Sequence, residues 1–335
     1  MRKLRFGVLG TAKIAREKVI PPMLRAERCE VVAIASRDLA AARALADRLG
    51  IAGAHGSYED LLADPAVEAV YIPLPNHLHV PWATRAAEAG KHVLCEKPIG
   101  LDAREAEGLI AVRDRTGVRI QEAFMVRTHP QWSRARDMVR SGRLGELRAI
   151  TGHFSYRLTD PGNVRNVAAW GGGGLLDIGC YPITTSRFVT GTEPRQAAAL
   201  IERDPKLGID RLGSVLLDYP GGVQCAFTYS TQTVPRQTMQ FIGTEARLEV
   251  EVPFNAPNDR PCRLLIYDAG DKLGGAVAET VEVPACDQYG IMADAFAACV
   301  LDGAPQPVPL EDSLANMRVI DAVFRAAEHG IWERP

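Results

Sequence analysis

Short apolar runs alternate with amphipathic stretches along the first third of the chain. The apolar runs have the length of buried strands, and the stretches between them repeat apolar residues at helical spacing. This alternation is typical of βαβ units and predicts an N-terminal α/β domain with a parallel sheet. The expected strands are residues 4–9, 30–35, 69–72, 93–95 and 118–123, and the expected helices are residues 39–49, 58–62, 80–89 and 102–116.

The pattern changes after Phe124, where polar and apolar residues alternate along much of the chain. Strands of this kind, joined by short turns such as Pro220-Gly221-Gly222, favour an antiparallel sheet with one face covered. The expected strands are residues 147–157, 197–203, 213–219, 223–230, 237–242, 246–252, 263–267 and 277–283, and the expected helices are residues 131–140, 288–301 and 310–329. We therefore predict two domains, residues 1–122 and residues 123–335, with the last helix packed back on the first domain.

The composition narrows the class of protein. A chain of 335 residues is too long for one small core, which agrees with two domains. Hydrophobic residues make up 47% and charged residues 24%, a balance that is ordinary for a globular protein. The formal net charge of -2 gives no support for a nucleic acid or an anionic membrane as a partner.

Cysteine usage and the N-terminus bear on the compartment. The seven cysteines are scattered without a Cys-x-x-Cys pair, so neither a disulfide framework nor a structural zinc site is indicated. The segment from Met1 to Phe6 leads directly into the first expected strand, with no apolar signal core. No apolar run approaches the roughly 20 residues of a membrane helix. We therefore expect a cytoplasmic protein.

A loop of small residues follows the first strand directly. The loop consists of Gly10, Thr11, Ala12, Lys13 and Ile14. Small residues let a phosphate approach the backbone N–H groups at the start of a helix. The spacing matches the dinucleotide fingerprint, although Ala12 and Ala15 replace two of its three glycines. We interpret the loop as a binding site for the pyrophosphate of a dinucleotide.

The residues after the second strand distinguish NADP from NAD. An NAD-binding fold usually places an acid there, about 20 residues after the loop, to hold the ribose 2′-hydroxyl. This chain has Ser36 and Arg37 at that point, and a hydroxyl with a guanidinium suits a 2′-phosphate. We therefore predict NADP(H) as the cofactor, with NAD(H) as the alternative. In a purely structural interpretation, Arg37 faces solvent and Asp38 caps the next helix, and both roles are compatible.

Bent and charged segments follow the third and fourth strands. Ligands of open parallel sheets bind in the crevice beyond the carboxyl ends of the strands. The third strand is followed by Leu74, Pro75 and Asn76, and the fourth strand is followed by Glu96, Lys97 and Pro98. Lys97 is the first candidate for chemistry, and the alternative is a solvated pair of Glu96 and Lys97. His77 and His79 also lie after the third strand, but loop histidines are more often capping or solvated groups.

A run of glycines interrupts the strands of the second domain. It reads Trp170-Gly171-Gly172-Gly173-Gly174 and is followed by a short apolar helix start. Asp177 and Tyr181 are four residues apart, so on a helix they share a face. A carboxylate and a phenol side by side can bind a polyol and exchange a proton with it. The alternative is a helix N-terminus with Asp177 in its first turn and a half-buried Tyr181.

These motifs together resemble the Gfo/Idh/MocA oxidoreductase family. The resemblance rests on the degenerate dinucleotide loop, Pro75-Asn76, Glu96-Lys97-Pro98 and the segment from Gly173 to Gly179, in this order, and it covers nearly the whole chain. It implies an N-terminal Rossmann domain, with a doubly wound parallel sheet, that binds NADP. It also implies a C-terminal α/β domain, with a large open, mainly antiparallel sheet, that binds substrate. Many members form dimers or tetramers through the open sheet, so we expect a homodimer or a homotetramer.

The resemblance also implies hydride transfer between a nicotinamide and a hydroxyl or carbonyl carbon of a sugar or cyclic polyol. Lys97 matches the family lysine that contacts the reacting oxygen, and Asp177 matches an aspartate near the substrate. Tyr181 departs from the histidine that many members carry as acid and base. It is similar to the branch that contains dimeric dihydrodiol dehydrogenase, NADP-dependent D-xylose dehydrogenases and glucose-fructose oxidoreductase.

We expect Lys97 and Tyr181 to meet over one nicotinamide ring, with Arg127 and Trp170 in the wall of the substrate site. Glu96 is expected among the cofactor-binding residues, and no metal is needed. The activity is then that of an aldose 1-dehydrogenase or a trans-dihydrodiol dehydrogenase. The alternatives are a non-catalytic NADP-binding sensor, an internally cycling aldose oxidoreductase and an NAD-dependent glycosidase. The expected ligand is a small sugar or polyol.

Overall fold

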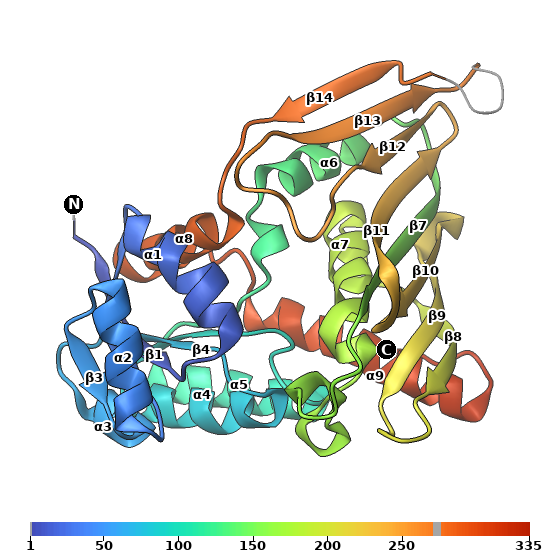
Figure 1. Ribbon diagram of the computed structural model, residues 1–335. Coiled ribbons are helices and arrows are strands. Elements are labelled where there is room, and N and C mark those ends of the chain that lie inside the picture. The colour runs from blue at the N-terminus through green and yellow to red at the C-terminus, as the bar shows by residue number, and fades with distance from the viewer. Residues whose placement is uncertain (1, 271–275) are drawn as a thin grey trace. The chain divides into compact units, whose positions relative to one another are not determined.

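The computed structural model describes residues 2–270 and 276–335, and its chain divides into two compact units (Figure 1). Unit 1 comprises Met1–Thr128 and Asp287–Leu314, and unit 2 comprises His129–Cys286 and Ala315–Pro335. This division differs from the predicted one at residue 122, because a C-terminal segment joins the N-terminal unit. Its helix α8 (Gln288–Asp302) packs on α1 (Ile20–Arg25), a contact between distant parts of the chain that local periodicity does not reveal.

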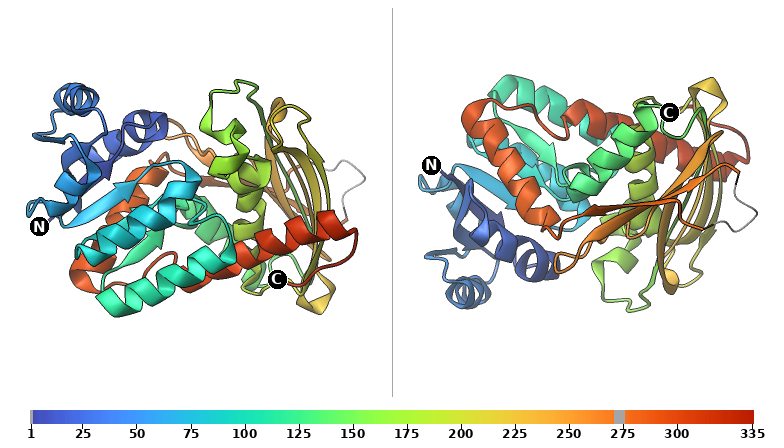
Figure 2. Two further views of the ribbon diagram at one scale, coloured as in Figure 1. Left: turned by 90° about the horizontal axis from the view of Figure 1, so that it is seen from below. Right: turned by 90° about the horizontal axis from the view of Figure 1, so that it is seen from above.

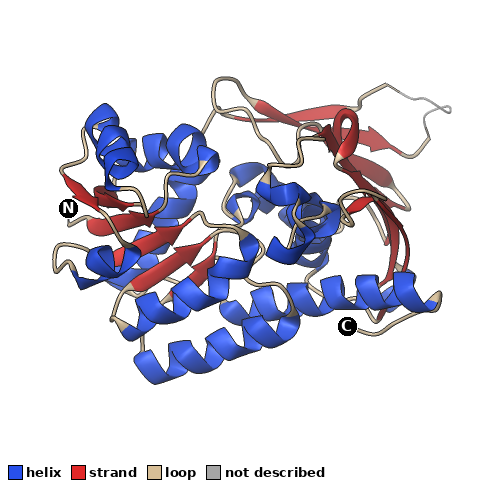
Figure 3. Ribbon diagram, turned by 60° about the horizontal axis from the view of Figure 1, so that its bottom comes forward, coloured by secondary structure: helices blue, strands red, loops and turns tan. Residues whose placement is uncertain are grey.

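Unit 1 is built on a six-stranded sheet in which all neighbours run parallel. Its strands are β1 (Leu4–Leu9), β2 (Cys29–Ala35), β3 (Gly53–His55), β4 (Ala69–Ile72), β5 (His92–Cys95) and β6 (Ile120–Glu122). Their order is β3-β2-β1-β4-β5-β6, so the direction of winding reverses between β1 and β4. The predicted Rossmann sheet is confirmed, and Figure 3 shows helices on either side of its strands.

Side chains at the helix starts explain where several helices of unit 1 begin. The helices are α1, α2 (Leu39–Leu49), α3 (Tyr58–Ala63), α4 (His79–Glu88), α5 (Ala103–Thr116) and α8. The side chains of Asp38, Ser57 and Asp102 each accept a first-turn backbone N–H, at 2.9, 3.0 and 2.8 Å. A π-helical segment, Ala15–Val19, leads into α1. The cap that we predicted at Asp38 is therefore present.

Unit 2 contains an eight-stranded sheet with one parallel pair, β7 with β10, among antiparallel neighbours. Its strands are β7 (Leu147–Arg157), β8 (Gln196–Arg203), β9 (Asp210–Asp218), β10 (Gln224–Ser230), β11 (Gln232–Gly243), β12 (Ala246–Val250), β13 (Cys262–Asp268) and β14 (Glu279–Val283). Their order is β14-β13-β12-β11-β7-β10-β9-β8. The predicted open, mainly antiparallel sheet is confirmed.

Helices cover one face of this sheet. They are α6 (Pro130–Arg140) and α7 (Cys180–Thr190), which pack on each other, and Figure 2 shows α7 against the sheet. Trp132 of α6 is fully buried and stacks on Phe254, with ring centroids 6.4 Å apart. The last helix, α9 (Leu310–His329), begins in unit 1, to which it belongs as far as Leu314, and continues in unit 2. No helix within residues 2–270 and 276–335 is both long and apolar enough to cross a membrane.

Candidate active site

The loop after β1 has the backbone that a dinucleotide requires. Gly10 has a φ of +114°, and its N–H donates to the carbonyl oxygen of Ala35 at 2.8 Å. A Cβ at this position would lie 3.2 Å from the Leu74 side chain and 3.6 Å from the Tyr58 hydroxyl. Any larger residue would therefore fill the space beside the loop. The residues that follow, Thr11 to Ile14, lead into the π-helical segment, and the start of a helix is where a phosphate can accept backbone N–H groups.

The residues after β2 lie beside this loop. Ser36 accepts the backbone N–H of Asp38 at 3.2 Å, and Arg37 is exposed. Burial raises the pKa of Tyr58, and the positive charge of Arg37 partly offsets the rise. The positive charge of Arg37 therefore acts on a phenol whose hydroxyl lies beside Gly10. The residues present fit a dinucleotide with a phosphate near Arg37, a role for Ser36 and Arg37 that stays a prediction.

The segments after β4 and β5 are joined by a buried histidine. The His79 ring lies between the carbonyl oxygens of Pro98 and Leu74, each 2.7 Å from a ring nitrogen. Burial lowers the pKa of His79 to about 4, so the ring is neutral near pH 7 and donates to one of the two oxygens. His79 therefore ties the loop of Leu74, Pro75 and Asn76 to the turn that follows Lys97.

Glu96 and Lys97 follow β5 directly, and the peptide bond between Lys97 and Pro98 is cis. The hydroxyl of Tyr71, on the neighbouring strand β4, donates to the Glu96 carboxylate at 2.6 Å. Lys97 is partly exposed. The structure therefore brings Gly10, Leu74 and Lys97 to the carboxyl ends of three adjacent strands, β1, β4 and β5. That edge of the sheet is where open α/β folds bind ligands.

A buried acid accepts a hydrogen bond from the turn that follows Lys97. Glu122, the last residue of β6, is fully buried, and its carboxyl accepts the backbone N–H of Ile99 at 2.8 Å. Burial raises the pKa of Glu122 to about 7, and the hydrogen bond from Ile99 acts in the opposite direction. This contact ties β6 to the backbone two residues beyond Lys97. Sequence analysis did not single out Glu122 for this contact, because a glutamate at a strand end is ordinarily solvated.

In unit 2, Asp177 lies in a π-helical segment, Leu175–Gly179, that leads into α7. Tyr156 donates its hydroxyl to one carboxylate oxygen, and Arg165 donates its Nε to the other at 3.1 Å. The Asp177 side chain is only 12% exposed. Both oxygens of the carboxylate are therefore engaged, which favours an orienting role over proton transfer. Neither Tyr156 nor Arg165 was predicted, because they come from separate segments before the glycine run.

Tyr181 is the second residue of α7, one turn after Asp177. Its ring is 5% exposed and packs edge-on against Phe154, with centroids 5.7 Å apart, and against Phe254 at 5.4 Å. These aromatic contacts restrict the rotamer of the phenol. The helix start that we predicted after the glycine run is present, with a wider π turn in place of a regular α turn.

Two models of known families match the chain. One, described as an oxidoreductase family with an NAD-binding Rossmann fold, covers residues 4–124, and the other, the GFO/IDH/MocA C-terminal domain, covers residues 132–249. The chain belongs to the GFO/IDH/MocA oxidoreductase family. The resemblance stated from the motifs is confirmed, and with it an NAD(P)-dependent dehydrogenase or reductase.

Relatives in this family match over nearly their full length. An uncharacterized oxidoreductase of Rhizobium meliloti is 53% identical, with 99% of each chain covered. The D-xylose 1-dehydrogenase (NADP(+)) 2 of Haloferax volcanii is 41% identical over 97% of this chain and 98% of its own. The structure is similar to that of KijD10, a 3-ketoreductase of Actinomadura kijaniata crystallised with NADP and TDP-benzene. The TM-score is 0.90, with 34% identity over 97% of this chain and 98% of that one.

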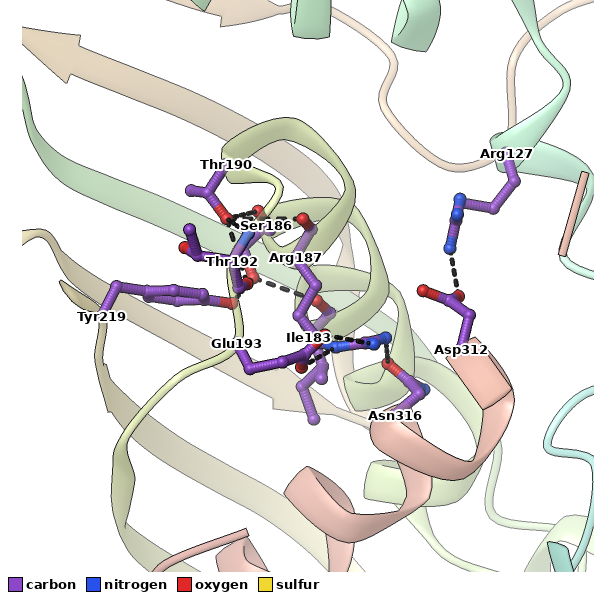
Figure 4. Close-up of polar contacts among 10 residues, drawn as sticks. All are labelled: Arg127, Ile183, Ser186, Arg187, Thr190, Thr192, Glu193, Tyr219, Asp312 and Asn316. Carbon is purple, nitrogen blue, oxygen red and sulfur yellow. Dashed lines mark hydrogen bonds and ion pairs between the residues drawn. The ribbon is translucent and has the colours of Figure 1, made fainter. Parts of the chain in front are cut away.

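The two expected wall residues of this family member lie in different surroundings. Arg127, in unit 1, is largely buried and forms an ion pair with Asp312 at the start of α9 (Figure 4). Trp170, in unit 2, ends a short 3₁₀ helix, Ala168–Trp170, and is 40% exposed. An exposed indole can pack on a sugar ring, whereas the Arg127 charge is already compensated. Their contribution to a substrate site stays a prediction.

Proposed function

We propose that the chain is an NADP-dependent oxidoreductase that transfers a hydride between the nicotinamide and a hydroxyl or carbonyl carbon of a sugar or cyclic polyol. In this proposal unit 1 binds NADP, and unit 2 binds substrate and mediates oligomerisation. The observation that carries it is the position of Lys97 at the carboxyl end of β5, one strand from β4 and two from β1. A lysine there stands at the ligand-binding edge of a dinucleotide fold.

The preference for NADP is supported by charge. Arg37 follows β2 by two residues, the part of a Rossmann fold that ordinarily holds the adenosine ribose, and its charge lowers the pKa of Tyr58, which lies beside Gly10. No carboxylate stands at Ser36 to hold a free 2′-hydroxyl. The names of two relatives also include NADP, a xylose dehydrogenase and a 3-ketoreductase. We therefore assign the 2′-phosphate to Arg37 and Ser36, and the pyrophosphate to the loop after β1.

When bound, NADP supplies the acceptor or donor of the hydride. The residues of this chain stabilise the charge that develops on the substrate oxygen and transfer its proton. The Lys97 ammonium stabilises the negative charge that develops on the substrate oxygen, as a preorganised cation does in a water-poor site. Tyr181 takes the hydroxyl proton in oxidation and returns it in reduction, and a neighbouring ammonium favours its ionised form. Asp177, held by Tyr156 and Arg165, orients a neighbouring substrate hydroxyl.

The oligomer is assigned to the uncovered face of the eight-stranded sheet. Large apolar side chains point outward there, Leu200 of β8 at 79%, Leu216 of β9 at 48% and Val234 of β11 at 78% exposure. Leu200 and Leu216 lie on the neighbouring strands β8 and β9, and exposed apolar side chains on one sheet are typical of a protein interface. We propose a homodimer or homotetramer through this face, which equilibrium sedimentation of the purified protein would test.

The experiment that tests the function is a substrate screen. The purified protein is inspected for bound nicotinamide absorbance and then assayed with aldoses, D-xylose among them, and with cyclic polyols including a trans-dihydrodiol, each with NADP or NAD. Reduction of added NADP by one sugar or polyol class supports the proposal. Binding of NADPH without turnover of any of these compounds contradicts it in favour of a sensor. Turnover that requires a second sugar and no added cofactor indicates an internally cycling enzyme.

A further inference from the structure

We propose that Asp210 is a positioning residue for hydride transfer, because its carboxylate fixes the backbone turn that carries Asp177 and leads to Tyr181. The inference rests on the function proposed for those two side chains. Asp210 is the first residue of β9, and no feature of the local sequence links it to the glycine run.

The contact is a hydrogen bond to the start of the π-helical segment. The backbone N–H of Leu175 donates to a carboxylate oxygen of Asp210 at 2.6 Å. The first N–H groups of a helix have no acceptor inside the helix, and the residue before this segment, Gly174, has no side chain that could cap it. Asp210, which is 2% exposed, supplies the acceptor from a different strand. It therefore holds the chain two residues before Asp177.

The same carboxylate explains two glycines of the motif. Gly173 has a φ of +129°, and a Cβ there would lie 1.9 Å from an Asp210 oxygen. A Cβ at Gly174 would lie 2.7 Å from ring carbons of Tyr229, on strand β10. Larger residues at these positions would push the segment away from β9 and β10. The glycine run thus lets the backbone approach Asp210 and Tyr229 closely.

Three side chains from other strands of the sheet interact with the Asp210 carboxylate. Tyr229 of β10, Arg203 of β8 and Tyr156 of β7 interact with it. Burial raises the pKa of Asp210 to about 6, and the Leu175 N–H and Arg203 lower it again in part. Near pH 7.5 the carboxylate form prevails, and an ionised acceptor makes the stronger hydrogen bond to a backbone N–H.

The far half of α7 is held by other contacts. Ser186 and the Tyr219 hydroxyl are 2.8 Å apart, and Arg187 binds both carboxylate oxygens of Glu193 at 2.6 and 2.8 Å (Figure 4). These contacts fix the helix from Ser186 onward. Its first turn, which carries Tyr181, follows directly on the segment that Asp210 holds at Leu175.

The test measures the hydride-transfer rate constant in a single turnover, with D-xylose or whichever aldose or polyol turned over fastest. In Asp210→Asn, an amide oxygen can still accept the Leu175 N–H but without the charge. We expect a roughly 10-fold lower rate constant in Asp210→Asn and a roughly 100-fold lower one in Asp210→Ala, since small misplacements of reacting groups have effects of this size. NADPH affinity, measured by fluorescence, should not change, because Asp210 lies in unit 2.

The rate constant of hydride transfer distinguishes a positioning role of Asp210 from a role in the stability of the fold alone. If Asp210 only stabilises the fold, its variants lose burst amplitude in proportion to unfolded protein while the rate constant stays at the wild-type value, and the proposal is overturned. The matched control is Asp218→Asn, at the other end of β9, where the carboxylate pairs with Arg195 on the surface. It should keep the wild-type rate constant. If it shows the same loss as Asp210→Asn, the effect is not specific and the proposal is overturned as well.

Failure of this inference is distinguishable from failure of the proposed function. Tyr181→Phe serves as the reference, measured in the same assay. If Tyr181→Phe loses hydride transfer while both Asp210 variants keep it, the function stands and only the positioning role of Asp210 is overturned. If Tyr181→Phe keeps wild-type hydride transfer, the acid–base role fails, and the positioning role fails with it.

Discussion

The turn after β5 in unit 1 and the segment before α7 in unit 2 are held in the same way by different parts of the fold. Each has a backbone N–H close to a proposed catalytic residue that donates to a buried carboxyl group. In unit 1 the donor is Ile99, two residues beyond Lys97, and the acceptor is Glu122. In unit 2 the donor is Leu175, two residues before Asp177, and the acceptor is Asp210. Both units therefore hold the backbone next to a proposed site residue, and in unit 2 the Asp177 carboxylate is held as well, by Tyr156 and Arg165.

The two regions differ in how the acid reaches its partner. Glu122 ends the strand next to β5, so neighbouring parallel strands bring it to Ile99. Asp210 begins β9, in the mainly antiparallel sheet of unit 2. It can accept the Leu175 N–H because the glycine run before Leu175 lets the backbone come close to it. Burial raises the pKa of both groups, to about 7 for Glu122 and about 6 for Asp210. Ionisation of each buried carboxyl group therefore lowers the stability of the folded state as the pH rises through its raised pKa.

Replacement of the proposed proton carrier should have the largest effect. Tyr181→Phe keeps the ring that packs on Phe154 and Phe254 but removes the hydroxyl. We expect kcat to fall by roughly 10²–10⁴-fold, the usual contribution of a general acid or base. NADPH binding should be unchanged, as measured by fluorescence titration. A near-wild-type kcat in this variant would show that Tyr181 is not the residue that transfers the proton.

The matching change in unit 1 removes the proposed electrostatic group. Lys97→Met retains most of the side-chain volume and loses the charge, so we expect kcat to fall by roughly 10²–10³-fold. The pH profile should also change, because in the proposed mechanism the Lys97 ammonium lowers the pKa of the Tyr181 phenol. The rise of kcat with pH in the oxidative direction should move to higher pH. Wild-type turnover in Lys97→Met would show that the reaction does not need the Lys97 ammonium.

The buried acid of unit 1 predicts the pH dependence of stability. The pKa of Glu122 is raised from 4.5 to about 7 by burial, so the folded state holds this proton more tightly than the unfolded state. Stability from this group is complete below about pH 4.5 and is lost as the pH rises to about 7, a difference of about 3 kcal/mol. Glu122→Gln cannot ionise, so urea unfolding at pH 5 and pH 8 should show it gaining on the wild type at the higher pH. An equal difference between the two proteins at both pH values would contradict this sign.

The smallest expected effect concerns cofactor choice. Arg37→Ala should weaken NADPH binding by roughly 10-fold, because it removes a charge-assisted contact to the 2′-phosphate, and should leave NADH binding nearly unchanged. Isothermal titration with each cofactor measures the ratio. Arg48→Ala, an exposed arginine in the last turn of α2, is the control and should affect neither. Equal weakening of NADPH and NADH by Arg37→Ala would end the 2′-phosphate argument.

The sequence by itself determined the elements and the family. Apolar runs predicted β1, β4 and β5 at or near their observed bounds, because buried parallel strands depend on local hydrophobicity. Turn and cap chemistry at Asp38 and Asp102 marked the starts of helices for the same local reason. The short strand β3 was missed, since Gly53–His55 has no apolar run and depends on pairing with β2.

Only the tertiary structure decided what surrounds the proposed catalytic residues. Tyr156 and Arg165 at Asp177, and Asp210 at Leu175, come from segments that local patterns treat as independent. A polar residue on a strand has the same sequence signature whether it faces water or accepts a buried N–H. The difference lies in which strand becomes its neighbour, and that follows from the packing of the whole unit. The membership of α8 in unit 1 has the same origin.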